Sequence, residues 1–418
     1  MEHTIHTYVD LEGVPCLVGR LWTRQAARRE SASFEYAPGW LKNPLRFALE
    51  PALTLDPGPH HTPMGLPLFG AIGDSAPDRW GRVLVQREER RKARSENRTP
   101  RTLSEADYLL GVSDIARQGA LRFAIREGGE FLAPNDSAAI PPLILLRKLL
   151  NAAQRIAANQ ENDEDLQLLL APGSSLGGAR PKASVMDRDG CLSIAKFPQN
   201  DDAWHVTLWE AVALDLAARS GIPLPAWRIE RVASRSVLLL RRFDRKGNTR
   251  IPFLSAMSMV GAADNEQHSY LEIVDALRRH SSRPAEDAAQ LWRRIVFNIL
   301  ISNTDDHLRN HGFLYDGGAG WRFSPAYDLN PVPVDVRPRV LSLAIDETDA
   351  TASLELAFAV AEQFGLKLHT ARKIAAEVGS AVSTWRDSAK KVGLTVKQAD
   401  RMESAFEHAD LHLACNKR

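Results

Sequence analysis

Asn303-Thr304-Asp305-Asp306-His307-Leu308-Arg309-Asn310 is the stretch that decides the fold of this 418-residue chain. Asp305 is followed five residues later by Asn310. Phosphoryl transfer needs a carboxylate that orients the attacking hydroxyl and accepts its proton, and a nearby amide oxygen on magnesium. Asp305 and Asn310 are predicted to supply these groups. The neighbouring Asp306 is predicted to be a helix cap or a solvated neighbour, with a catalytic role as the alternative.

A second segment, Phe323-Ser-Pro-Ala-Tyr-Asp328, extends the pattern. The aspartate-to-asparagine spacing above is that of a protein-kinase catalytic loop, and kinases hold magnesium with a further carboxylate on a short downstream turn. Residues 313–315 and 321–323 are predicted to form a hairpin between the two segments. We expect this hairpin to bring Asn310 and Asp328 side by side at its base.

A third segment carries small residues and lysines suited to phosphate oxygens. It is Ser174-Ser-Leu-Gly-Gly-Ala-Arg-Pro-Lys182, and a strand containing Lys196 follows it. Small residues let backbone amides approach phosphate, and a lysine on the next strand neutralises its charge. Glu210, on an otherwise apolar helix, needs a cationic partner if it is buried, and Lys196 is the expected one.

Hydrophobic periodicity predicts a mixed α/β part followed by a largely helical part. The expected strands are 119–126, 182–186, 192–197 and 237–243, and the expected helices are 78–94, 143–157, 205–220, 285–302, 355–364 and 369–386. Glu161–Asp165 is expected to be an exposed turn. The basic run Arg87–Arg101 also contains glutamates, so a solvated helix face is its expected role. A contact with DNA or an acidic partner is the alternative.

Composition excludes several classes of protein. A net charge of +1 gives no global field toward nucleic acid or membrane, so any such contact needs a local patch. No apolar run is long enough to span a bilayer, and no signal peptide is visible. Three scattered cysteines argue against a disulfide scaffold or a metal site. We expect a cytoplasmic protein with no membrane contact.

Taken together, the motifs resemble those of the HipA family, serine/threonine kinases that act as toxins of type II toxin–antitoxin pairs. Five segments occur in the family's order: Ser174–Lys182, Ala195–Pro198, Arg241–Arg245, Asn303–Asn310 and Pro325–Pro331. Two more, Asp74–Arg82 and Gln118–Phe123, look like its N-terminal region, so the resemblance covers nearly the whole chain. It implies a two-lobed, protein-kinase-like α/β fold. An N-terminal β-rich subdomain would span 1–135, a kinase N-lobe 140–245 and an α-helical C-lobe 246–418.

The resemblance also implies roles for individual residues, with ATP and Mg²⁺ as cofactors. Asp305 would be the catalytic base, and Asn310 and Asp328 would hold the metal. Nucleotide contacts are implied for Gly177, Gly178, Ala179, Lys182, Lys196, Arg241, Phe243, His307, Asn310, Tyr327 and Asp328. Arg241–Phe243 would be the hinge strand along the adenine, where other members can carry an acidic residue in place of Arg241. Ser175 matches a loop serine that such kinases phosphorylate on themselves, and Ser174 is its nearest competitor.

The implied partners are a HipB-like helix-turn-helix antitoxin and a protein substrate. DNA would be reached only through the antitoxin complex, and growth would stop by phosphorylation of a translation component such as an aminoacyl-tRNA synthetase. Two alternatives stay open: a small-molecule phosphotransferase with the same residues, and a non-catalytic co-repressor partner of the antitoxin. The non-catalytic alternative has no need for all four of the intact residues Lys196, Asp305, Asn310 and Asp328.

Overall fold

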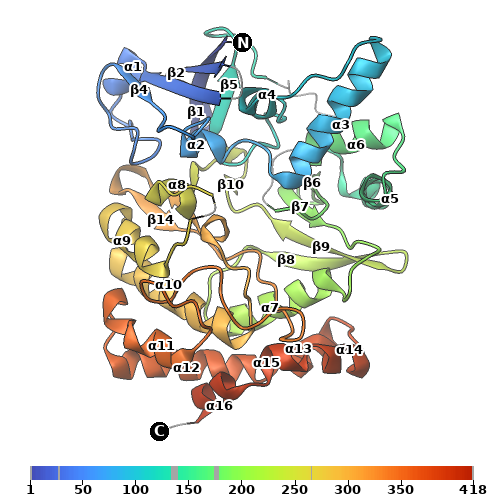
Figure 1. Ribbon diagram of the computed structural model, residues 1–418, viewed down its shortest axis with the longest axis vertical. Helices are drawn as coiled ribbons and strands as arrows, with labels where there is room; N and C mark the ends of the chain where they lie inside the picture. Colours follow the sequence, from blue (N-terminus) through green and yellow to red (C-terminus); the bar gives the residue numbers. More distant parts are fainter. Residues whose placement is uncertain (1, 27–28, 133–139, 174–177, 265, 417–418) are drawn as a thin grey trace. The chain divides into compact units, whose positions relative to one another are not determined.

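The chain divides into two compact units, whose elements are drawn in Figure 1. The computed structural model describes residues 2–26, 29–132, 140–173, 178–264 and 266–416. Unit 1 comprises Met1–Asp201 and Glu230–Gly261, and unit 2 comprises Asp202–Ile229 and Ala262–Arg418. A β-rich N-terminal part, a mixed α/β character and a helical C-terminal part confirm the predicted fold class. The finer division at 1–135, 140–245 and 246–418 stays a prediction.

An antiparallel sheet of five strands, in the order β4-β3-β2-β1-β5, opens unit 1. Its strands are β1 (Glu2–Leu11), β2 (Val14–Ala26), β3 (Arg29–Tyr36), β4 (Pro59–His61) and β5 (Leu121–Ala124). Ile5, Leu21 and Phe34 lie opposite one another in register and are fully buried, because alternate side chains of a strand share a face. β5 is shorter than the strand expected over 119–126.

A second sheet of unit 1 contains the two strands predicted around the small-residue segment. β6 (Lys182–Met186), β7 (Leu192–Lys196) and β9 (Arg235–Arg241) pair antiparallel in that order. β9 begins and ends two residues earlier than predicted. Gly190, in the turn between β6 and β7, has a φ of 76°, a conformation that glycine adopts without strain.

Three helices pack with this sheet into one apolar core: α3 (Arg79–Ser95), α5 (Leu146–Ala157) and α6 (Asp163–Gly173). α5 contributes Leu146, Leu149, Leu150, Ala153 and Ile156, spaced so that they share one face of the helix. The helices predicted over 78–94 and 143–157 are therefore present, the second with a 3₁₀ turn, η1 (Leu143–Leu145), at its start.

The expectation of an exposed turn at Glu161–Asp165 is wrong, because α6 begins at Asp163 and Asp165 is buried. Asp165 and Asn162 cap each other: the Asp165 amide donates to Asn162 Oδ1 (2.8 Å), and the Asn162 amide donates to Asp165 Oδ2 (3.2 Å). Arg155 Nε also donates to Asp165 Oδ2 (2.6 Å), and this bond lowers the pKa of Asp165. Asn162 thus caps the start of α6, and Arg155, ten residues before Asp165, compensates the buried carboxylate.

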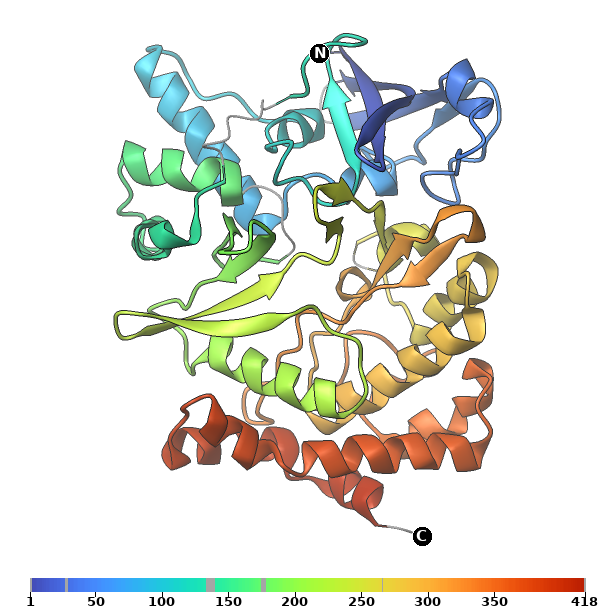
Figure 2. The same ribbon diagram turned by 180° about the vertical axis from the view of Figure 1, so that it is seen from behind.

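Unit 2 is organised around α10 (Pro284–Leu300), which packs on α9 (Tyr270–His280), α11 (Leu354–Ala359) and α12 (Leu368–Val382), as Figures 1 and 2 show. The helix expected over 369–386 ends at Val382 and a separate α13 (Trp385–Lys391) follows. α7 (Val206–Arg219) packs on α12 and α13, and confirms the helix expected over 205–220. The sequence analysis missed α9.

The remaining elements are short. Unit 1 also has α1 (Pro38–Leu41), α2 (Gly70–Gly73), α4 (Glu105–Leu110), β10 (Arg245–Lys246), β11 (Thr249–Arg250), β12 (Phe253–Ser255) and α8 (Ala256–Val260), and β8 (Trp227–Val232) crosses the unit boundary. Unit 2 also has η2 (Leu308–Asn310), β13 (Gly312–Tyr315), η3 (Gly317–Ala319), β14 (Trp321–Phe323), η4 (Ala361–Phe364), α14 (Val396–Arg401), α15 (Glu403–Phe406) and α16 (Ala409–Cys415). Among the helices of the described ranges, none has the length and apolar character that crossing a membrane requires.

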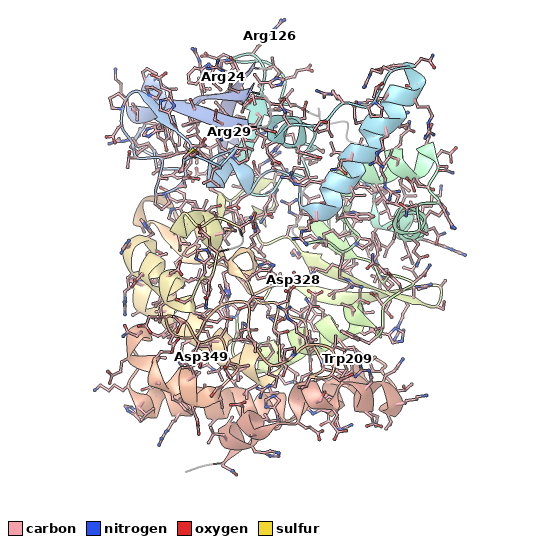
Figure 3. All side chains as sticks on the ribbon, viewed as in Figure 1. Arg24, Arg29, Arg126, Trp209, Asp328 and Asp349 are labelled. Carbon is pink, nitrogen blue, oxygen red and sulfur yellow. The ribbon has the colours of Figure 1, made fainter. Side chains whose placement is uncertain are left out.

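An aromatic cluster joins α7 to the C-terminal helices of unit 2. The rings of Trp385 and Phe406 stack with centroids 4.7 Å apart and an interplanar angle of 6°. Trp209 of α7, labelled in Figure 3, lies 6.2 Å from Trp385 and 5.9 Å from Phe406. All three side chains are buried, so large apolar areas are removed from water at this point.

Phe406→Ala should lower the free energy of unfolding by about 3–5 kcal/mol, because it leaves a cavity between two tryptophans. Guanidinium denaturation followed by tryptophan fluorescence measures this loss. Val396→Ala is the control: Val396 is 76% exposed, and its loss should change stability by no more than about 0.5 kcal/mol. Similar losses in both variants would contradict the assigned core.

Candidate active site

The Asp305–Asn310 loop of unit 2 connects the end of α10 to β13. Burial alternates along the loop. The side chains of Thr304, Asp306, Leu308 and Asn310 are buried, whereas those of Asp305, His307 and Arg309 are exposed. Alternate residues therefore anchor the backbone, and the residues between them are presented to solvent.

Asp306 anchors the loop through a carboxylate that is almost completely buried, with 2% of the residue exposed. Its Oδ2 accepts hydrogen bonds from the Tyr270 hydroxyl (2.6 Å), Asn298 Nδ2 (2.7 Å) and His311 Nε2 (2.9 Å). Burial alone would raise the pKa of Asp306, but His311 and the donated hydrogen bonds outweigh it, so the pKa is lowered. The interpretation of Asp306 as a helix cap or solvated neighbour is wrong.

Asn303 provides a second brace, between α10 and the downstream turn. Its Nδ2 donates to Asn298 Oδ1 (3.0 Å), and its Oδ1 accepts the backbone amide of Asn330 (3.2 Å). The Tyr327 hydroxyl donates to the carbonyl of Arg309 (2.8 Å). Side chains of both segments thus tie the Asp328 turn to the catalytic loop.

The hairpin predicted between the two segments is present. β13 pairs with β14 antiparallel, with Phe313 opposite Phe323, and the amide of Ser324 donates to the carbonyl of Gly312 (2.8 Å). Asn310 precedes the first strand and Asp328 follows the second, so both belong to the open end of one hairpin.

Asp328, labelled in Figure 3, has a φ of +60°, in the left-handed region that non-glycine residues rarely adopt. Such a conformation costs about 1–3 kcal/mol and persists only where the surroundings impose it. Asn330 Nδ2 donates to Asp328 Oδ1 (3.2 Å) and holds one oxygen of the carboxylate. The turn therefore fixes the direction of this side chain at an energetic cost.

Asn310 and Asp328 fit a magnesium ion. Asn310 Nδ2 donates to the carbonyl of Asp305 (3.1 Å), which directs the amide oxygen away from that contact. Amide and carboxylate oxygens are hard ligands, and proteins hold Mg²⁺ with one or two carboxylates together with substrate phosphates rather than in a protein cage. The described part of the chain has no group of three or more His, Cys, Asp or Glu that could hold a metal by itself. The metal-binding role of Asn310 and Asp328 stays a prediction.

Asp305, the predicted base, is solvent-accessible: 65% of its side chain is exposed. Its Oδ1 lies 3.0 Å from Nη1 of Arg337, which the sequence analysis did not single out. His307 is also exposed and immediately precedes η2. The loop thus presents the Asp305 carboxylate to solvent, while the buried residues on either side hold its backbone.

The two predicted phosphate-binding lysines lie in unit 1, opposite each other on β6 and β7. Lys182 is buried, and its Nζ donates to Asp78 Oδ2 (2.8 Å) and to the carbonyl of Gly178 (2.9 Å). Asp78 also caps α3, because its Oδ1 accepts the amide of Gly81 (2.7 Å). Burial raises the pKa of Asp78, against the opposing effect of Lys182.

Lys182 therefore holds the backbone of Gly178 in the described end of the small-residue segment, a role that the sequence analysis missed. Asp78 could be recognised as a helix cap, but its pairing with a lysine 104 positions away has no local signal. Phosphate contacts of Lys182, Lys196, Gly178 and Ala179 stay predictions. Gly177 and Ser175 lie outside the described residues.

The other predicted contacts are distributed over both units. Arg241 ends β9 and forms an ion pair with Asp189, and the Phe243 ring lies 6.3 Å from that of Phe253. Glu210 is buried on α7, which is the condition under which a cationic partner was expected for it. The hinge role of Arg241 and Phe243, and the pairing of Glu210 with Lys196, stay predictions.

The basic run Arg87–Arg101, which begins on α3 and continues past its end at Ser95, forms several ion pairs within unit 1. Arg91 Nε lies 2.8 Å from Glu88, Arg98 Nη1 lies 2.5 Å from Glu89, and Arg101 Nη2 lies 2.8 Å from Asp107. These pairs support the interpretation of a solvated face whose charges are compensated locally. Contact with DNA stays a prediction.

The chain is similar in sequence and in fold to known proteins. Residues 174–385 match the family model described as HipA-like C-terminal domain. Two proteins of Sinorhizobium fredii, named "Putative kinase Y4mE" and "Putative kinase Y4dM", are each 27% identical to the chain, over 181 and 213 residues. These matches cover 37% and 49% of this chain, and 41% and 50% of the relatives, so the chain spans half or less of their length.

Among solved structures, the chain is similar to HipA from Shewanella oneidensis MR-1, determined in a toxin–antitoxin complex with HipB and its operator DNA. The TM-score is 0.68 at 16% sequence identity, and the match covers 98% of this chain and 96% of that one. Identity at this level supports the fold alone.

Asp306→Asn should lower the free energy of unfolding by about 3–5 kcal/mol, because a neutral amide replaces the buried acceptor of three hydrogen bonds. Urea denaturation of wild type and variant measures the loss. Because the folded-state pKa of Asp306 is lowered, its contribution is fully present above the unfolded value of 3.8. The difference between the two proteins should therefore shrink as the pH falls below 3.8.

The adjacent Asp305→Asn is the matched control. Its exposed side chain should contribute no more than about 0.5 kcal/mol to stability. Equal effects of the two substitutions, or a difference that does not depend on pH, would contradict the anchoring role of Asp306.

Proposed function

The chain belongs to the HipA-like family, and from this premise we propose that it is an ATP- and Mg²⁺-dependent protein serine/threonine kinase. The observation that carries the proposal is the braced loop of unit 2. It presents Asp305 to solvent, five residues before Asn310, and is tied through Tyr327 to the turn of Asp328. A kinase needs these three groups, and a binding scaffold has no use for the strained turn that orients one of them.

Each residue has a distinct role in the proposed reaction. Asp305 orients the serine or threonine hydroxyl of the substrate and accepts its proton as the oxygen attacks phosphorus. Asn310 and Asp328 would hold magnesium, which supplies charge neutralisation at the phosphates when bound. Lys196 is proposed to align the phosphates, and Glu210 to hold Lys196. Rate enhancement of this kind comes from positioning and from charge stabilisation.

The proposed biological role is that of a toxin restrained by a HipB-like helix-turn-helix antitoxin. Support comes from the similarity in fold to HipA of Shewanella oneidensis, which was solved with HipB and operator DNA. The net charge of +1 agrees with DNA being reached through the antitoxin. The proposed target is a translation component such as an aminoacyl-tRNA synthetase, whose phosphorylation would arrest growth.

Asp305→Asn should lower phosphoryl transfer at least about a hundredfold, because a general base contributes this much or more. Asp328→Asn should have a comparable effect through loss of a metal ligand. Incorporation of label from radiolabelled ATP into the proteins and the metabolites of a cell extract measures transfer. Label in metabolites alone would favour a small-molecule phosphotransferase.

The control is Asp275→Asn, at an aspartate whose side chain is 54% exposed and pairs with Arg278 on α9. It should transfer phosphate and impair growth as the wild type does, whereas the Asp305 and Asp328 variants should do neither. Equal toxicity of wild type and inactive variants would favour a non-catalytic partner of the antitoxin.

Ser175 is the proposed site of self-phosphorylation, with Ser174 as competitor. A phosphate would add about −1.5 to −2 charges beside the segment proposed to bind ATP phosphates, and would repel the nucleotide. Ser175→Asp should therefore bind ATP at least about tenfold more weakly in calorimetry, one like-charge contact being worth roughly 1.4 kcal/mol. Ser175→Ala should bind ATP normally and lack the phosphopeptide. Tight binding by the aspartate variant, or phosphate only on other residues, would contradict this assignment.

A further inference from the structure

The segment that follows the Asp328 turn returns to the catalytic loop within unit 2. We call Asn330–Val340 the docking segment. Its Arg337 places Nη1 3.0 Å from Oδ1 of Asp305, and the two side chains are 43% and 65% exposed. Ion pairs this exposed contribute little to stability, because water competes for both charges. The pair therefore opens easily, and the fold does not depend on it.

The docking segment is held in place by contacts that do not involve Arg337. The amide of Val332 donates to the carbonyl of Ser302 (3.2 Å), and that of Val334 donates to Ser404 Oγ (3.2 Å). Arg339 forms a largely buried ion pair with Asp410 (2.7 Å), and its Nη2 donates to the carbonyl of Ile299 (3.0 Å). Arg337 can consequently release Asp305 while the backbone around it stays fixed.

Apolar side chains of the docking segment are exposed beside this arginine. Val334, Val336 and Val340 are 43%, 50% and 46% exposed. Pro331 and Pro333 of the same segment are buried. The backbone of the segment therefore packs on the protein, whereas the three valine side chains are exposed to solvent. Exposed aliphatic residues grouped within one short segment are typical of a surface that contacts another chain.

We propose that the docking segment binds the acceptor segment of the protein substrate, and that Arg337 selects a carboxylate next to the acceptor serine or threonine. The inference rests on the proposed kinase function and specifies its substrate class. As the substrate docks, Arg337 exchanges the Asp305 carboxylate for that of the substrate, which keeps the guanidinium paired and frees Asp305 for the hydroxyl proton. The valines contact an aliphatic side chain of the same acceptor segment. A cationic substrate residue would instead meet Arg337 as a like charge.

Synthetic peptides with one serine flanked by leucine and by glutamate, glutamine or lysine test the proposal. Wild type should favour the glutamate over the glutamine peptide about fivefold in kcat/KM, mainly through KM, as an exposed ion pair of about 1 kcal/mol predicts. Arg337→Gln should remove this preference. Arg337→Glu should reverse it toward the lysine peptide, an outcome that a merely structural role would not produce.

The matched control is Arg283→Glu, which also removes an exposed, ion-paired arginine of unit 2. Arg283 is the N-cap of the 17-residue α10, whose other end leads to the catalytic loop, so it lies roughly 25 Å from that loop. This variant should keep the wild-type preference. Val336→Ser should weaken only the preference for leucine over alanine beside the acceptor, and leave the preference for glutamate intact.

Two outcomes separate the failure of this inference from that of the proposed function. Asp305-dependent transfer that ignores the flanking charge, or an Arg337→Glu variant with the wild-type preference, would overturn the inference and leave the kinase proposal standing. Absence of Asp305-dependent transfer to every peptide and protein would overturn both.

Discussion

The buried carboxylate of Asp306 is the interaction on which the candidate site depends. Three donors reach one of its oxygens from α9, from α10 and from the residue before β13. A carboxylate removed from water must be satisfied by such donors, since an unpaired buried charge costs several kcal/mol. Because the donors come from separate elements, satisfying one charge fixes the loop relative to two helices and a hairpin. Asp305 immediately precedes Asp306, so its backbone is held in place although its side chain is exposed.

Buried residues that anchor the backbone alternate along the loop with exposed residues that are accessible to solvent. Asp306, Leu308 and Asn310 are buried, whereas Asp305 and His307 between them are exposed. A catalytic carboxylate that was itself buried would be desolvated and would lose access to a protein substrate. Without buried neighbours, the carboxylate would not be held in one position. Positioning of the reacting groups contributes much of the rate enhancement in phosphoryl transfer. The alternation satisfies both requirements within six residues.

The parts of the site that the sequence predicted are those encoded by local spacing. The five-residue interval from Asp305 to Asn310, the hairpin, and the strands β6 and β7 follow from patterns within about twenty residues. The buried pairs were not predictable in this way. Asp306 meets Tyr270 from 36 positions away, and Lys182 meets Asp78 from 104 positions away. A polar residue in a sequence shows that it needs a partner, but only the fold decides which residue provides it.

The backbone conformation of Asp328 also depends on long-range contacts rather than on local sequence. Its left-handed backbone is unfavourable for an aspartate, and no local pattern in Pro325–Pro331 requires it. The conformation persists because Tyr327 is tied to the carbonyl of Arg309 on one side and the amide of Asn330 to Asn303 on the other. Both ties end on the braced catalytic loop. The free energy that orients the Asp328 side chain therefore comes from the same buried network that places Asp305, so Asp306 supports both halves of the candidate site.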